Sequence, residues 1–517
     1  MLRKILCLSL CFIFAISICA CGDSGNNKTV SSNASTTSDS SSSTIIDNES
    51  TDSTDSKTES TNEGVENTPI ETTTLVPDNM PIISINTADG SNSFVTDFGR
   101  EEKLQGLIDY VDATITVNSG DENFDFSGVE AEVKVRGNYT LTYDKKPIRI
   151  KFSKKQSMLG LHNGEKYKNW VLLADWKDLS MTNNALTFYL GKHLFGEDGY
   201  YCSDFRYVEV YINNNYWGVY LLAEQQEVKD GRFTATEVED NYAGTDIGYM
   251  FEFDGYYTEE QQVPNGEGDP TFTVNYNDDR YTQIGYTVKS DIYSSEQLEF
   301  IQNFVENTYH ISKIAINDNV FLKFDDTYTN VIESPAKSKR EAIGEVIDLQ
   351  SLVDIYILQE IAKDPDIAWS SFYMSVDMSE NGNKKLVFEA PWDFDSAYGI
   401  KKKYTSYDGL FAADSLNPWL SLLAHEDWFI EMVKDRWNKM TEQKVQENAL
   451  KLVLEIKEKY TAHFARNYDK WKKRALHGNG ELIPEVNAFR TQGEAADYLH
   501  NWLSHRFQYL DSVWGNK

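Results

Sequence analysis

The segment LVDIYILQEIAKDPDIAWSSFYMSVDMSENGNKKLVFEAPWDFD, residues 352–395, decides how this chain folds. Asp348, just before this segment, is expected to cap the start of a helix whose apolar residues follow at helical spacing, and that pattern breaks at Asp364-Pro365-Asp366. Two short strands, 372–376 and 386–388, are expected next, with the turn-forming sequence ENGN between them. The segment therefore predicts a helix, a loop and a hairpin, followed directly by Pro391-Trp392-Asp393-Phe394-Asp395.

Upstream of this segment, alternating apolar residues predict a series of strands interrupted by one helix. The expected strands are 132–135, 148–152, 170–173, 207–212, 217–222 and 249–253, and the expected helix is 184–194. Residues 254–291 are polar and rich in glycine and tyrosine, which predicts a long irregular insertion. From Trp419 onward, apolar stripes predict helices. This order of strands, helix, linker, helix, loop and hairpin is that of a protein-kinase fold.

Asp366 and Asp393 both lie where a regular element ends, and a buried carboxylate there is costly unless it meets a cation or a proton. In kinase chemistry one loop aspartate receives the proton of the attacking hydroxyl, and a second holds the Mg²⁺ that bridges the phosphates. The element order assigns these two positions to Asp366 and Asp393. The sequence contains no H-E-x-x-H, G-x-S-x-G, Walker A or paired C-x-x-C signature, which argues against the corresponding hydrolase, nucleotide-loop and metal-site classes.

Further motifs occur in a fixed order along the chain. They are Arg136-Gly137-Asn138, KKPIRIK at 145–151, WVLL at 170–173, NNYWGVYLLAE at 214–224 and PWDFD at 391–395. Together they resemble the CotH family of spore-coat atypical protein kinases, over most of residues 80–517. The resemblance implies an α+β, atypical protein-kinase-like two-lobe fold, with a β-rich N-terminal lobe at about 80–290 and a helical C-terminal lobe at about 291–517.

The same resemblance implies an activity and its cofactors. The expected reaction is transfer of the γ-phosphate of ATP to Ser or Thr hydroxyls of surface or coat proteins, with Mg²⁺ or Mn²⁺. Asp366 matches the catalytic-loop aspartate and Asp393 the metal-binding aspartate, with Asp395 as a second metal contact. Ser371 stands where a kinase has its metal-binding asparagine, and a hydroxyl is a weaker Mg²⁺ ligand than an amide or carboxylate.

A basic strand is expected to face the phosphates of the nucleotide. Alternation directs Arg149 and Lys151 to the same face, opposite the apolar residues of strand 148–152. The basic candidates are Lys151, which is the first choice, and Arg136, Lys146 and Arg149. Glu224, at the start of Glu224-Gln225-Gln226, is expected in the hinge that reads the base.

Two departures from the kinase pattern leave a second class of function open. The chain has no G-x-G-x-x-G loop over the phosphates, and helix 184–194 carries no acidic residue for the usual lysine–glutamate pair. The alternative is a catalytically degenerate kinase-fold surface scaffold, or an adhesion or cell-wall-binding protein.

The N-terminal part predicts export and anchoring. A basic start and an apolar run end at Ile18-Cys19-Ala20-Cys21, which resembles a lipoprotein signal peptide (1–21) with Cys21 as the lipidated thiol. A plain signal peptide is the alternative. Residues 22–79 are rich in Ser, Thr, Asn, Asp and Glu and predict a disordered tether. The expected location is the extracellular face of the cell membrane, through a lipid anchor.

Charge and cysteine content limit which partners and which disulfides are expected. The 49 basic and 81 acidic residues give a net charge of −32, which argues against a nucleic-acid partner. Cys202 is the only cysteine beyond the signal region, so no intramolecular disulfide is expected after processing. The expected partners are therefore a protein substrate with Ser or Thr hydroxyls, and the membrane that holds the anchor.

Overall fold

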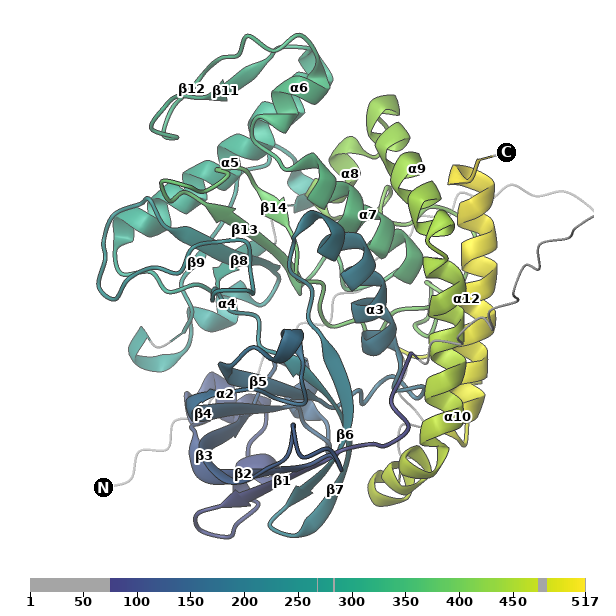
Figure 1. Ribbon diagram of the computed structural model, residues 1–517. Coiled ribbons are helices and arrows are strands. Elements are labelled where there is room, and N and C mark those ends of the chain that lie inside the picture. The colour runs from purple at the N-terminus through teal and green to yellow at the C-terminus, as the bar shows by residue number, and fades with distance from the viewer. Residues whose placement is uncertain (1–74, 267, 282–283, 473–480, 517) are drawn as a thin grey trace, which may run out of the picture. The chain divides into compact units, whose positions relative to one another are not determined.

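The first seven strands close into a barrel (Figure 1). They are β1 (Ile82–Thr87), β2 (Val111–Asn118), β3 (Phe126–Val135), β4 (Ile148–Gln156), β5 (Tyr167–Leu173), β6 (Phe205–Ile212) and β7 (Asn215–Glu224). The computed structural model describes residues 75–266, 268–281, 284–472 and 481–516. The order around the barrel is β1-β2-β3-β4-β5-β7-β6, and β1 closes it by pairing in parallel with β6.

The barrel is held together by the apolar side of its alternating strands. On β4, Ile148, Ile150 and Phe152 are almost fully buried and pack inside the barrel, as their spacing predicts. Arg149, between them in sequence, therefore lies on the outer side of the strand. The barrel interior is thus a packed core, and polar side chains of β4 are available to the neighbouring part of the molecule.

A second sheet combines strands from two distant parts of the chain in the order β14-β13-β8-β10-β9. Its strands are β8 (Gly248–Asp254), β9 (Thr271–Phe272), β10 (Gly285–Val288), β13 (Phe372–Asp377) and β14 (Val387–Phe388). The expected irregular insertion at 254–291 therefore contains two strands of this sheet and the short helix α4 (Tyr257–Glu260). The hairpin after Asp366 is confirmed as β13 and β14.

The prediction of a two-lobe kinase-like fold is wrong, although the chain is an α+β protein. β8 belongs to the predicted β-rich lobe and β13 to the predicted helical lobe, yet they pair antiparallel from Phe253 opposite Phe372 to Gly248 opposite Asp377. The first seven strands, β1 to β7, close on themselves as a barrel. Alternation identifies strands from local sequence, but it contains no information about distant partners, which decide the architecture.

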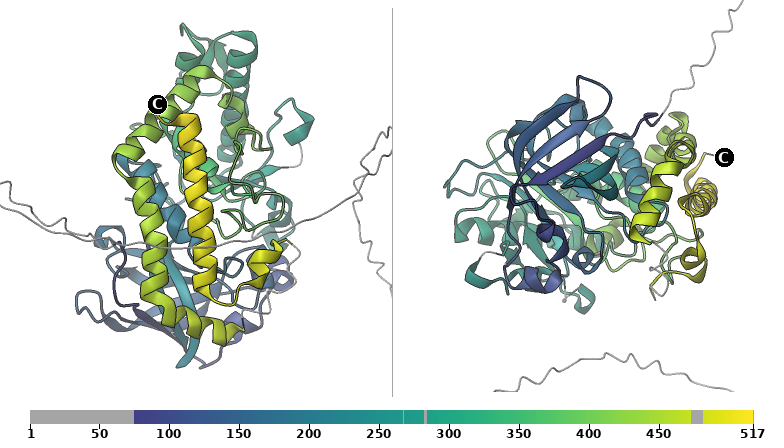
Figure 2. Two further views of the ribbon diagram at one scale, coloured as in Figure 1. Left: turned by 90° about the vertical axis from the view of Figure 1, so that its right-hand side faces the viewer. Right: turned by 90° about the horizontal axis from the view of Figure 1, so that it is seen from below.

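Helices cover the second sheet and one side of the barrel. They are α1 (Ser93–Thr96), α2 (Arg100–Leu104), α3 (Asn183–Phe195), α5 (Ser295–Asp318), α6 (Lys339–Gly344), α7 (Leu349–Ala362), α8 (Pro418–Leu423), α9 (Asp427–Glu442), α10 (Val445–Trp471), α11 (Pro484–Ala488) and α12 (Gln492–Trp514). The long helices α10 and α12 run side by side (Figure 2). A separate hairpin of β11 (Leu322–Phe324) and β12 (Val331–Glu333) extends beyond α6 (Figure 1).

Helix α7 begins as its sequence predicts. The Asp348 carboxylate accepts a hydrogen bond of 3.1 Å from the Ser351 amide, which satisfies a free N–H of the first turn. Almost every residue of α7 is buried, so the helix lies inside the molecule and delivers the following loop to a fixed place. That loop contains Asp366.

The described residues begin with a segment attached to α10. The Leu75 and Val76 amides donate to Glu455 Oε2 at 2.9 and 3.2 Å, and Tyr460 donates to the Pro77 carbonyl at 2.8 Å. The predicted signal peptide (1–21) and the predicted tether up to residue 74 lie outside the described residues. Within the described part of the chain, no helix is both long and apolar enough to cross a bilayer.

Candidate active site

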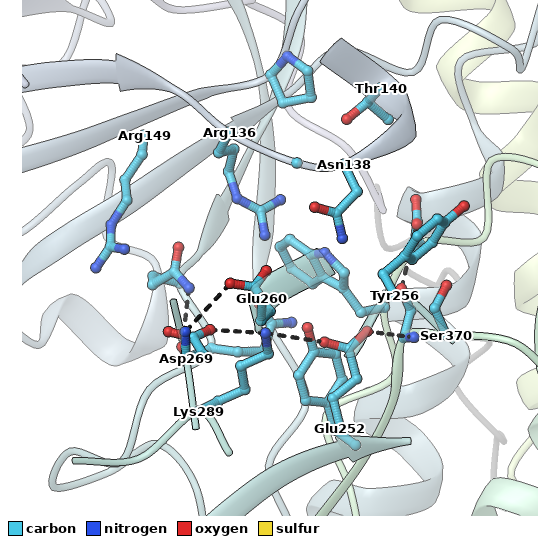
Figure 3. Close-up of a pocket in the computed structure, with 18 of the residues that line it drawn as sticks. Arg136, Asn138, Thr140, Arg149, Glu252, Tyr256, Glu260, Asp269, Lys289 and Ser370 are labelled. Carbon is cyan, nitrogen blue, oxygen red and sulfur yellow. Dashed lines mark hydrogen bonds and ion pairs between the residues drawn. The ribbon is translucent and has the colours of Figure 1, made fainter. Parts of the chain in front are cut away.

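A cavity of about 920 Å³ lies between the barrel and the second sheet, which is within the usual size range of small-ligand sites. Its wall is formed by the ends of β3 and β4, the segment after β7, strands β8 and β10, and the loops before β13 and after β14. Figure 3 shows Arg136 and Arg149, from the barrel, facing Glu252 of β8 across the cavity.

The cavity brings together the three aspartates that the sequence singles out, Asp366, Asp393 and Asp395. Asp366 begins a tight turn, in which its carbonyl accepts bonds from the Trp369 and Ser370 amides at 2.8 and 3.0 Å. Asp393 and Asp395 follow β14, so two separate loops contribute carboxylates to one space.

Two of the metal-site candidates have strained backbone conformations. Ser371 and Asp393 have φ angles of 61° and 69°, in the left-handed region that side chains disfavour. The Ser371 hydroxyl donates to Asp393 Oδ2 at 3.3 Å. The surrounding packing therefore holds both residues in a costly conformation that directs their oxygens toward each other.

Lys177, in the loop between β5 and α3, is the central cation of this cluster, and sequence reasoning missed it. Its amine donates to Ser396 Oγ at 3.0 Å. Burial acts to lower the pKa of Lys177, but Asp395, Asp366 and Asp393 raise it above its usual value. The amine therefore stays charged. No motif surrounds Lys177, and its only sequence signal is a basic residue in a loop that enters a helix.

Arg136 is a predicted basic residue that lines the same cavity as the aspartates. It lies at the end of β3, and its guanidinium is 5.4 Å from the centre of the Trp392 ring. Burial lowers the pKa of Arg136, while the nearby charge of Asp393 acts in the opposite direction. Arg149 also lines the cavity, on the neighbouring strand.

Three other predicted residues do not line the cavity. Lys151 forms an ion pair of 3.0 Å with Glu132 on the adjacent strand. Lys146, two residues before β4, is buried and does not line the cavity. Glu224 is fully buried, and its Oε1 lies 3.2 Å from His162 Nδ1. Cys21, the predicted lipidation site, lies outside the described residues.

The charges of the cavity aspartates favour a divalent cation. Burial raises the pKa of Asp395 to about 7, and burial also raises the pKa of Asp393, while Lys177 opposes both shifts. The two carboxylates and the Ser371 hydroxyl would offer oxygen donors, which Mg²⁺ prefers. Among the described residues, no group of three or more histidine, cysteine, aspartate or glutamate side chains is arranged so that it could hold a metal ion. Water and phosphate oxygens would complete the coordination, as is usual for Mg²⁺.

Helix α3 positions the segment after β14 through amide groups instead of a carboxylate. Asn184 accepts a bond from the Phe394 amide at 2.8 Å and donates to Asp175 Oδ1 at 2.7 Å. Thr187 and the Tyr398 hydroxyl are 2.7 Å apart. The absence of acidic residues from this helix therefore leaves an asparagine to fix the backbone between Asp393 and Asp395.

Glu252 and Lys289 form a second ion pair on the floor of the cavity, at 3.6 Å (Figure 3). Glu252 Oε1 accepts a bond of 2.7 Å from the Ser371 amide. Burial raises the pKa of Glu252 to about 7. The pair thus connects β8 and the end of β10 to Ser371, which contacts Asp393. Glu252 lies in the predicted strand 249–253 and Lys289 within the predicted insertion 254–291, and no sequence motif points to either.

A family model described as CotH kinase protein matches residues 133–510. The chain belongs to the CotH family. The match begins in β3 and ends in α12, so it includes nearly the whole cavity wall and every candidate aspartate. This CotH protein is therefore kinase-like by family. No curated protein matches the chain closely enough to count as a relative.

Proposed function

We propose that this CotH protein transfers the γ-phosphate of ATP to Ser or Thr hydroxyls of a surface or coat protein, with Mg²⁺ or Mn²⁺ as the metal. The observation that carries the proposal is the convergence of Asp366, Asp393 and Asp395 on one cavity with Lys177 and Arg136. Phosphoryl transfer needs this combination, because the donor brings several negative charges that cations must offset.

The residues divide between metal and phosphate by their chemistry. Asp393 and Asp395 would hold the divalent cation, with Ser371 beside them. When bound, that cation neutralises charge that develops on the phosphate oxygens. Lys177 and Arg136 add fixed positive charge from two other elements of the fold. Lys177 is buried and Arg136 is half-buried, which strengthens this effect, because electrostatic attraction increases as water is excluded.

Asp366 is the proton acceptor in the proposal. The acceptor hydroxyl oxygen forms a bond to the γ-phosphorus, the bond from that phosphorus to ADP breaks, and the hydroxyl proton passes to Asp366. Lys401 Nζ lies 2.9 Å from Asp366 Oδ1 and holds the carboxylate in place. The acceptor therefore approaches from the open side of the cavity, where Asp366 remains partly exposed.

We further propose that Cys21 carries a lipid that anchors the protein to the outer face of the membrane. The support is the sequence Ile18-Cys19-Ala20-Cys21 after a basic and apolar start. Cells supplied with a labelled fatty acid test this directly. We expect label on the wild-type chain and none on Cys21→Ala; equal labelling of both would contradict the anchor.

The test of the proposed activity is phosphate incorporation from γ-labelled ATP with Mg²⁺ or Mn²⁺. The full-length chain is offered a serine-rich protein and a peptide of residues 35–61, beside Asp393→Asn and a surface control, Asp326→Asn. We expect incorporation by the wild type and the control, and almost none by Asp393→Asn. No incorporation into any acceptor, together with no binding of ATP, would rule the proposal out.

A further inference from the structure

Trp369 is a large aromatic residue that lines the cavity and stays exposed beside Asp366, with 41 % of its surface open to solvent. Of the tryptophans among the described residues, it alone is exposed. Its amide donates to the Asp366 carbonyl at 2.8 Å, so the two residues belong to one tight turn. An exposed indole next to a site is a feature of surfaces that contact a partner.

The segment after β8 holds the indole of Trp369 in one place. The Trp369 carbonyl accepts a bond of 2.5 Å from the Gly255 amide. A side-chain carbon at Gly255 would lie 2.5 to 2.8 Å from three atoms of the ring, so the indole rests directly on the glycine backbone. Tyr256 meets the ring edge-on, with the two ring centres 5.7 Å apart. The indole is therefore a preorganised platform.

The carboxylates on the two segments that form this platform, 254–260 and 364–371, are all buried or paired with cations. Asp254 and Asp364 are buried. The remaining three form the ion pairs Asp366–Lys401, Glu259–Arg100 and Glu260–Lys103. The Arg100 guanidinium also lies 5.1 Å from the centre of the Tyr256 ring, so a cation of the chain already occupies that ring face. The platform is therefore suited to an uncharged side chain.

We infer that Trp369 is a specificity-determining residue for the acceptor, and that its indole binds an aromatic side chain next to the Ser or Thr that receives the phosphate. This inference rests on the proposed function and adds which flanking sequence the enzyme takes. An acceptor hydroxyl that reaches Asp366 brings its neighbouring residues to Trp369, because both residues belong to one turn and line one cavity. Two aromatic rings attract each other beyond the area they bury, and a glycine offers no such contact.

The test is the KM of the full-length protein for three serine peptides, measured with γ-labelled ATP and Mg²⁺. The peptides differ only in the residue on both sides of the serine, which is phenylalanine, arginine or glycine. We expect the KM for the phenylalanine peptide to be about tenfold below that for either of the others. The peptide of residues 35–61 contains no aromatic residue and should resemble the glycine peptide. This arm needs no substitution and so does not depend on a variant that folds.

Variants then assign the preference to Trp369. Trp369→Ala should bring the KM values for the phenylalanine and glycine peptides to within about twofold of each other, while the KM for ATP stays at its wild-type value. Trp369→Phe keeps an aromatic face and should recover most of the preference. The control is Tyr407→Ala, which removes a similarly exposed aromatic residue that does not line the cavity, and it should keep the wild-type ratio.

Each outcome separates the inference from the function on which it rests. Equal KM values for the three peptides, or the lowest KM for the arginine peptide, would overturn the preference, and an unchanged ratio in Trp369→Ala would overturn the assignment to Trp369. Transfer to the serine-rich protein but to none of the three peptides would overturn the inference alone. If no acceptor is labelled, the inference fails, and the absence of ATP binding as well would rule out the proposed function.

Discussion

Two clusters of buried charge in this molecule differ in how their charges are balanced. Around Arg436 of α9, the single guanidinium bonds to Asp354 at 2.8 Å and to Glu197 and Asp198 at 2.7 Å each. Each of its three nitrogens donates to a protein acceptor, including the Leu194 carbonyl. This cluster joins α3, α7 and α9, and it does not line the cavity.

The cavity cluster has the opposite character. Burial and the nearby charge of Asp393 raise the pKa of Asp395, burial and Asp366 raise that of Asp393, and Ser371 and Asp393 have strained backbone. A structural cluster is expected to satisfy its charges internally, whereas a site for a charged ligand keeps charges that only the ligand satisfies. The difference supports a structural role for the Arg436 cluster and is in line with the proposal that the cavity cluster binds a cation and phosphates.

Arg436→Met should produce the largest loss of stability. The substitution leaves Asp354 buried without its cation, and removal of one member of a buried pair costs about 4 kcal/mol. Urea unfolding measures this loss. The control is Lys439→Met, which removes an exposed partner of Glu197 and should cost less than about 1 kcal/mol. Equal losses in the two variants would contradict the structural role of Arg436.

Asp393→Asn should lower phosphate transfer without lowering stability. Phosphate transfer is expected to fall between about a hundredfold and a thousandfold, because a charge that stabilises the transition state is lost. The free energy of unfolding should not fall, since the variant removes a carboxylate whose charged form is disfavoured, first by burial and then by Asp366. Initial rates of label transfer and urea unfolding check both halves. A variant that unfolds more easily yet transfers phosphate normally would make the site structural.

Glu252 should give the protein a pH-dependent stability. Its folded pKa of about 7 is above the unfolded value of about 4.3, so the folded state binds the extra proton between these limits. The resulting stabilisation is complete below pH ~4 and is lost as the pH rises through about 7. Glu252→Gln should reduce the fall in unfolding free energy between pH 5 and pH 8 by about 2 kcal/mol.

The measurement is urea unfolding across that pH range without added metal. Glu333→Gln, on the exposed strand β12, is the control and should keep the wild-type slope. An identical pH dependence in Glu252→Gln and the wild type would show that Glu252 has an ordinary pKa.

Lys401→Met should have the smallest effect of the four. The partly exposed ion pair with Asp366 orients the proton acceptor, so its loss should lower kcat about tenfold and leave the KM for ATP unchanged. Lys402→Met, at the exposed neighbouring position, should have no effect. Lys401→Arg should recover part of the rate. A changed KM with an unchanged kcat would mean that Lys401 contacts the nucleotide instead.

Much of the local structure could be predicted from the sequence, because local patterns carry it. The spacing of Ile148, Ile150 and Phe152 predicted a strand with one apolar face, and Asp348 predicted the start of α7. Closure of the barrel could not be predicted, since β1 meets β6 through residues more than a hundred positions apart, such as Ile82 and Glu209. Pairing over that distance leaves no local signature.

The candidate site was predictable where motifs existed and not elsewhere. Asp366 and Asp393 stood at element ends, and the structure brings both to the cavity. Lys177 lies in a loop without a motif, so only the folded structure reveals it. Lys151, the first choice for the phosphates, stands opposite Glu132 in the β3–β4 register, and opposite charges on paired strands attract each other.

The most direct test of the central claim is the metal dependence of nucleotide binding. A non-hydrolysable ATP analogue is titrated into the wild type, Asp393→Asn and Asp326→Asn, with Mg²⁺ and with EDTA. We expect Mg²⁺ to tighten binding at least tenfold, roughly 1.4 kcal/mol, in the wild type and Asp326→Asn but not in Asp393→Asn. Equal affinity with Mg²⁺ and EDTA, or a normal Mg²⁺ effect in Asp393→Asn, would contradict the claim that the cavity aspartates hold the metal.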